Sequence, residues 1–236
     1  MNKKLPLMNI LITSWKYCLS NFNVCAIFTA LFYIMGALAV WSWKTWMFMP
    51  IVVGLYVLWG VFFRVYFNRR PYFMPKSLFN SLLPSTKIVL LTIVVATFFI
   101  MLQFVPLFIN VSPEFNQKYA QFLQGDIERN GVLVLITNLL FLMVSPQIAY
   151  RPFLGWISAL IGRSGSLKIA WEKTKGNYKE FLIISLLTDC LLTVIRWGIV
   201  SVGGNDYVTM VFAAPLIVYF NVISAQAYEF FFLNKE

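Results

Sequence analysis

The stretch KIVLLTIVVATFFIMLQFVPLFI, residues 87–109, decides the fold class of this chain. It carries no charge after Lys87, and its length meets the roughly 20 residues that a helix needs to cross a hydrocarbon core. A backbone in lipid must satisfy its own hydrogen bonds. The stretch is about twice as long as a barrel strand and lacks the alternating polarity of one. We therefore expect a transmembrane helix here.

Five further apolar runs of similar length extend this prediction to the whole chain; they lie at 24–43, 48–67, 131–150, 181–201 and 207–231. The composition agrees, because 60% of the residues are hydrophobic and only 12% are charged. A water-soluble domain could not cover so much apolar surface. The sequence predicts an all-α fold, a single membrane domain over 1–236 with about six transmembrane helices.

The lysines and arginines are distributed unequally between the two sides of these six runs. One side carries fifteen of them and the other only Lys44, Lys118, Arg129 and Arg196. Cytoplasmic flanks retain positive charge during insertion, so we expect the N- and C-termini in the cytoplasm. The acidic loop residues support this orientation, because they lie on the opposite side from most of the lysines and arginines; they are Glu114, Asp126, Glu128 and Asp206.

An internal repeat precedes the first and the fifth run. LITSWKYCLSNF at 11–22 recurs 156 positions later as LKIAWEKTKGNY at 167–178, so that Trp15 and Asn21 correspond to Trp171 and Asn177. Helical spacing places the apolar residues of each copy on one face. We predict interfacial helices at 5–22 and 164–179, the second capped by Ser164 or Ser166. A third, weaker surface helix is expected around 76–79, before the third run.

Two interpretations of these amphipathic helices are open. Each helix could set the angle at which the chain enters the bundle, or it could sense the membrane surface and dock a partner. In either case the lysines, including Lys175, would face anionic phospholipid headgroups. Tryptophans at both boundaries, with Trp156 among those on the inner side, are typical of an aromatic belt.

The repeat also carries a resemblance to a known family. Ala170-Trp171 followed by Thr174-Lys175-Gly176-Asn177, with a degenerate copy at 10–31, resembles the YciC-type bacterial inner-membrane proteins. It also resembles the membrane domain fused to some glycerophosphodiester phosphodiesterases, whose catalytic domain is a separate soluble unit. The resemblance implies a bacterial cytoplasmic membrane and no known activity.

The inventory of reactive residues argues against catalysis. The chain has no histidine, which removes the commonest general base and metal ligand. Its three cysteines lack the spacing of a metal site, and it has no phosphate-binding loop. We therefore expect no enzyme, cofactor or metal. The net charge of +10 is spread beside the membrane runs, so we expect no nucleic-acid partner.

Polar residues inside the apolar runs are the remaining candidates for a site. Asp189 and Arg196 in the fifth run each cost about 2.5–3.5 kcal/mol near the bilayer centre and need a partner or water. Neighbouring runs offer Gln103, Asn138 and Asn221. Such a cluster could be structural, or it could line a cavity or ion path. Arg196 and Arg64 could also extend to the outer and inner membrane surfaces.

Two classes of function follow from these features. The first is a non-catalytic scaffold or assembly and membrane-homeostasis factor, with the lipid bilayer and a membrane protein as partners. The second is a transporter or lipid-handling protein that uses the polar intramembrane residues. The sequence favours the first.

Overall fold

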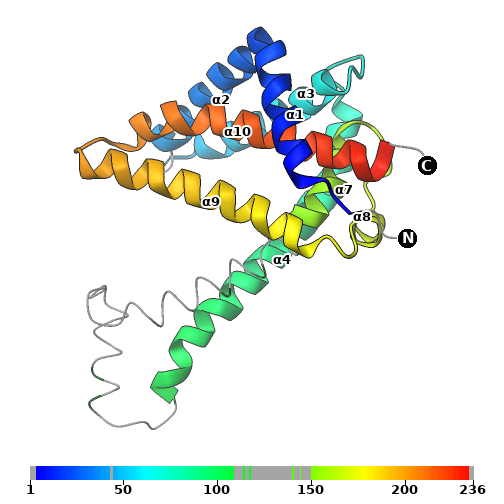
Figure 1. Ribbon diagram of the computed structural model, residues 1–236. Helices are drawn as coiled ribbons and strands as arrows, with labels where there is room; N and C mark the ends of the chain where they lie inside the picture. The colour runs from blue at the N-terminus through cyan, green and yellow to red at the C-terminus, as the bar shows by residue number, and fades with distance from the viewer. Residues whose placement is uncertain are drawn as a thin grey trace.

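A computed structural model describes residues 4–42, 45–108 and 150–233, together with 114, 117, 140 and 144. The regular secondary structure in these ranges is helical throughout (Figure 1). The helices are α1 (Leu7–Ser20), α2 (Phe22–Ser42), α3 (Phe48–Tyr66), α4 (Pro75–Phe108), α7 (Arg151–Leu160), α8 (Leu167–Lys173), α9 (Tyr178–Ser201) and α10 (Asp206–Tyr228), which continues as a π-helical turn at Glu229–Leu233. The all-α prediction is confirmed for this part of the chain.

Five of the helices in the described ranges are long and apolar enough to cross a membrane, namely α2, α3, the first part of α4, α9 and α10. Four of them match predicted runs to within a few residues, and the third, Pro75–Val95 in α4, overlaps the run predicted at 87–109. The run at 131–150 lies outside the described residues, apart from 140, 144 and 150. By the length and composition of these helices, the protein is a polytopic membrane protein.

Helix α10 occupies the centre of the packed helices. It lies against α1, α2 and α9, and its second half is almost completely buried. The short helix α7 packs between α3, α4, α8 and α10. The start of α1 and the end of the C-terminal turn lie at one end of the molecule with α8 and the α3–α4 connection, whereas the start of α3 and the α9–α10 connection lie at the other (Figure 1).

Helix α7 was not predicted, and its burial corrects the placement of Trp156. Trp156 is only 5% exposed and packs against Trp59 and Phe63, with ring centroids 6.0 and 6.5 Å apart. The aromatic-belt prediction for this residue was therefore wrong. The sequence RPFLGWISAL is apolar nearly all round after Arg151, which suits a helix enclosed by others, but it is too short to read as a span.

The predicted surface helices before the third and fifth spans also need correction. The helix predicted at 164–179 ends after Lys173, and Gly176 then adopts a φ of +87° that breaks it from α9. Of the two predicted capping residues, Ser166 caps α8. Its Oγ accepts a hydrogen bond from the backbone N–H of Ile169 at 3.3 Å. The segment at 76–79 is no separate helix, because α4 begins at Pro75 and runs continuously into the span.

Arg64 is buried, not extended to the membrane surface. It is 5% exposed, and its Nε donates to the Pro71 carbonyl at 2.8 Å while Nη1 donates to Ser77 Oγ at 3.0 Å. The side chain therefore ties the end of α3 to the start of α4. Acceptors within the chain replace the headgroups that we expected it to reach.

Candidate functional site

The repeat motif forms a joint around the guanidinium of Arg151, a residue that is only 7% exposed. Its Nε donates to Thr174 Oγ1 at 2.8 Å, and Nη2 donates to the Trp171 carbonyl at 2.7 Å. The guanidinium carbon also lies 4.3 Å from the centre of the Trp171 ring, a cation–π contact. Burial lowers the pKa of Arg151, but the ordinary value is high enough to keep the group charged.

The same motif holds the N-terminal segment. Asn177 is 1% exposed, and its Oδ1 accepts the backbone N–H of Leu5 at 2.7 Å. Lys4 Nζ donates to the Gly176 carbonyl at 3.1 Å and lies 3.8 Å from the Glu180 carboxylate. We call the set Leu5, Arg151, Trp171, Thr174 and Asn177 the motif joint. It connects α7, α8 and α9 to the segment that leads into α1.

The first copy of the repeat has different surroundings. Trp15 is 59% exposed, with an edge contact to Tyr219 at 6.1 Å between ring centroids. Asn21 Nδ2 donates to the Tyr17 carbonyl at 3.1 Å, a local contact at the end of α1. The motif residues thus form a joint only in the second copy. Sequence reasoning missed Arg151, because this partner comes from another helix outside the repeat.

Exposed basic residues belong to segments at the end of the molecule that holds the motif joint (Figure 1). The exposed ones belong to the α3–α4 connection, the start of α4 and the segment from α7 to the start of α9; they are Arg69, Arg70, Lys76, Arg163, Lys168, Lys173, Lys175 and Lys179. We call this set the cationic end. Lys173 also contacts the Phe232 ring at 5.1 Å, so the C-terminal turn lies beside α8.

Two of the predicted intramembrane polar residues have described side chains. Arg196 is exposed and lines a cavity of about 620 Å³ between α2, α3, α9 and α10, together with Asp206. Asn221 is 6% exposed and does not line this cavity, and its Nδ2 has no hydrogen-bond partner among the described residues. Asn138 and the side chains of Gln103 and Asp189 lie outside the described part of the structure. The role of these five residues stays a prediction.

Metal ligands do not gather in the part of the chain that the structure describes: no group of three or more cysteine, aspartate or glutamate side chains there could hold an ion.

No family model, curated protein or solved structure matches the chain. The resemblance carried by residues 166–187 therefore stays a prediction from the motif alone.

Proposed function

We propose that this protein is a non-catalytic scaffold of the bacterial cytoplasmic membrane, with six spans and both termini in the cytoplasm. Its cationic end binds anionic phospholipid headgroups and an acidic surface of a membrane-protein partner. The proposal makes the protein an assembly or membrane-homeostasis factor and not an enzyme.

The proposal rests on a difference within the second repeat copy between the motif residues and the lysines. Trp171, Thr174 and Asn177 make intramolecular contacts, whereas the lysines between and beside them stay exposed. The motif joint and the exposed lysines beside it thus lie together at the end of the molecule where α1 starts and the C-terminal turn ends (Figure 1). Each basic residue near an anionic leaflet contributes about 1 kcal/mol to the attraction.

The exposed face of α1 supports an interfacial position for this helix. Met8, Ile12 and Trp15 are 68%, 50% and 59% exposed, and they follow helical spacing. The opposite face is packed, since Ile10 and Ser14 are buried and Thr13 Oγ1 lies 2.6 Å from the side-chain amide of Gln226 in α10. An apolar stripe on a helix fastened to the bundle is suited to lie at headgroup depth.

The test compares two sets of variants by the size of the native assembly. Membranes are solubilised in mild detergent, and the protein is followed on a native gel. We expect the combined substitution Lys168→Gln, Lys175→Gln and Lys179→Gln to lose the larger assembly seen for the unmodified chain. Asp189→Asn and Arg196→Gln should keep it. An unmodified chain that migrates alone would contradict the scaffold, as would an assembly that resists the triple substitution.

A transporter is the second candidate, and the cavity that Arg196 and Asp206 line favours it. Opposite charges at the mouth of a cavity between four membrane helices could admit a polar solute. This function requires Arg196 or Asp189 for activity and tolerates loss of the surface lysines. Failure of uptake into vesicles with Arg196→Gln, and normal uptake with the triple lysine variant, would establish it over the scaffold.

A further inference from the structure

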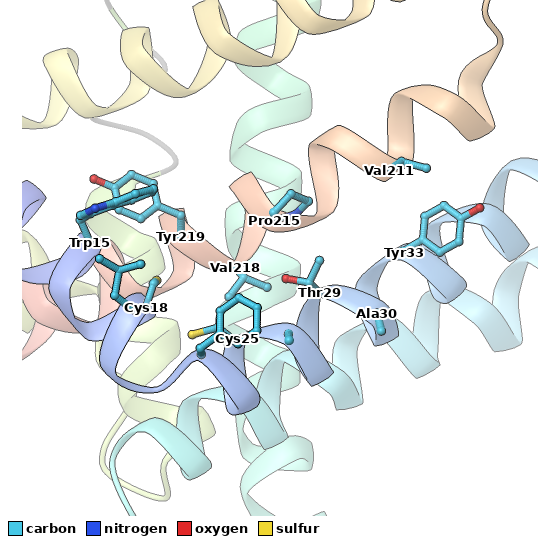
Figure 2. A pocket seen from close by; sticks show the side chains of 13 residues that line it. Trp15, Cys18, Cys25, Thr29, Ala30, Tyr33, Val211, Pro215, Val218 and Tyr219 are labelled. Carbon is cyan, nitrogen blue, oxygen red and sulfur yellow. The ribbon is translucent and has the colours of Figure 1, made fainter.

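An apolar groove runs between α1, α2 and α10, away from the motif joint. Its volume is about 650 Å³, and no charged residue is among its described lining residues. Trp15 and Tyr219 lie at one end and Tyr33 and Val211 at the other, with Cys18 and Cys25 between them (Figure 2). Pro215 also lines the groove, inside α10, where it cannot donate a hydrogen bond to the preceding turn.

The groove has the length of one lipid leaflet. Its lining on α2 extends from Phe22 to Tyr33, about 16 Å at 1.5 Å per residue. Half of a hydrocarbon core of about 30 Å is nearly the same distance. Trp15 belongs to α1, the helix that the proposed function places at headgroup depth, so the groove leads from there toward the middle of the bilayer.

The second repeat copy carries a much larger side chain at one of the positions that line the groove. Cys18 and Cys25 correspond by position to Thr174 and Phe181. Phe181 is fully buried, and its ring centroid lies 5.2 Å from that of Tyr150. Thr174 accepts a hydrogen bond from Arg151. In the first copy a thiol occupies each of these two positions, and at the second position Cys25 is much smaller than the phenylalanine ring of Phe181. The small side chain at Cys25 leaves room for the groove that it lines.

We propose that the groove binds one acyl chain of a phospholipid from the leaflet beside α1. The chain lies along α2 and α10, and the glycerol and phosphate lie next to Trp15, whose ring is suited to the boundary between polar and apolar regions. Lys16 is exposed on the next position of α1 and supplies a cation for the phosphate. Contacts with three helices distinguish this lipid from those that only surround the protein, since close packing is what holds groups together within a membrane.

A photoreactive lipid tests this assignment. The intact protein is reconstituted with phosphatidylglycerol that carries a diazirine in one acyl chain, irradiated and mapped by peptide mass spectrometry. We expect adducts concentrated at residues 15–33 and 211–219. Ala26→Trp, which places a large ring in the groove lining, should reduce them about tenfold, equivalent to about 1.4 kcal/mol. Ile27→Trp is the matched control, because Ile27 is 60% exposed and lies outside the groove lining, and should change nothing there.

Three results would overturn the proposal. Adducts that are as frequent on α4 and α9 as on the groove residues would show that the groove holds no lipid of its own. Equal effects of Ala26→Trp and Ile27→Trp would show that the groove does not select the lipid. A polypeptide cross-linked to residues 15–33 in the original membrane would identify a protein segment as the occupant. If Ala26→Trp does not fold, the adduct map of the unmodified chain still decides between the groove and an even distribution.

Discussion

At the scale of single residues, Arg151 is the side chain on which the motif joint depends most. Two hydrogen bonds and a ring contact hold its buried guanidinium. We expect Arg151→Met to lower the free energy of unfolding by about 2–3 kcal/mol, since hydrogen bonds to charged groups and a desolvated cation–π contact are lost. The midpoint of thermal unfolding in detergent measures the effect.

Arg163→Met is the control for this prediction. Arg163 is exposed and lies just beyond the end of α7, so its loss should change stability by no more than about 0.5 kcal/mol. Equal losses from the two substitutions would mean that the joint around Arg151 is not a special source of stability.

Asn177 gives a second prediction, because its side chain fixes the start of the chain. Asn177→Ala removes the acceptor for the Leu5 N–H, at a cost of about 1–2 kcal/mol, and should speed hydrogen exchange in the peptide that contains Leu5. Asn177→Asp keeps an oxygen at this position and should keep the protection. Asn21→Ala, the same substitution in the other repeat copy, should leave Leu5 unaffected. Unchanged exchange in Asn177→Ala would contradict the docking of this segment.

The residues of the motif could be found from the sequence, but their roles could not. A spacing of 156 residues identifies Trp171 and Asn177 as counterparts of Trp15 and Asn21. It does not reveal that Trp171 packs against an arginine and Trp15 against Tyr219, because Arg151 lies on a helix that is not repeated. In the sequence, a buried arginine at the end of a span cannot be told from an exposed basic residue that flanks the membrane.

At the scale of elements, the break between α8 and α9 depends on Gly176. Its φ of +87° is costly for any residue with a Cβ atom. We expect Gly176→Ala to destabilise the protein by about 1–2 kcal/mol and to loosen the contacts of Asn177 that follow it. Thermal unfolding and the exchange of the Leu5 peptide measure the two effects.

Gly198 lies in the span that follows Gly176 and provides the opposite expectation. It lies in α9, and a Cβ atom there would meet nothing within 4 Å. Gly198→Ala should therefore be neutral or stabilise the helix by up to about 1 kcal/mol. A loss of stability as large as that of Gly176→Ala would show that the backbone conformation at 176 is not the reason for the difference.

Short elements were the least predictable ones. Continuous apolar runs identify α2, α3, α9 and α10 to within a few residues, because each must span the bilayer. Helix α7 has only ten residues and reads as the end of a span followed by a basic loop. Its burial arises from contacts with four other helices, which local sequence does not encode.

At the scale of the whole molecule, hydropathy cannot tell which span lies at the centre. The apolar windows of α9 and α10 have nearly equal mean hydropathy, 1.8 and 1.9, yet 6% of the first and 56% of the second are buried within the protein. Lipid and protein interior are similarly apolar, so a sequence suited to one is suited to the other. The central position of α10 therefore had to come from the structure.

The sidedness of the membrane, in contrast, can be predicted from charge alone. The structure places the start of α1, the end of the C-terminal turn and the segments of the cationic end together, and the start of α3 and the α9–α10 connection opposite (Figure 1). With fifteen of nineteen lysines and arginines on one side, that side should be cytoplasmic. The proposed scaffold depends on this orientation, because its cationic end must meet the cytoplasmic leaflet.

Labelling of single introduced cysteines by a membrane-impermeant maleimide tests this orientation most directly. The sites are Arg70→Cys and Lys175→Cys in the cationic end, and Trp46→Cys and Val202→Cys, which replace residues 78% and 82% exposed at the opposite connections. In right-side-out vesicles we predict labelling at 46 and 202 and none at 70 and 175, with the reverse pattern in inside-out vesicles. Labelling of 70 and 175 from the outside would contradict both the topology and the scaffold that rests on it.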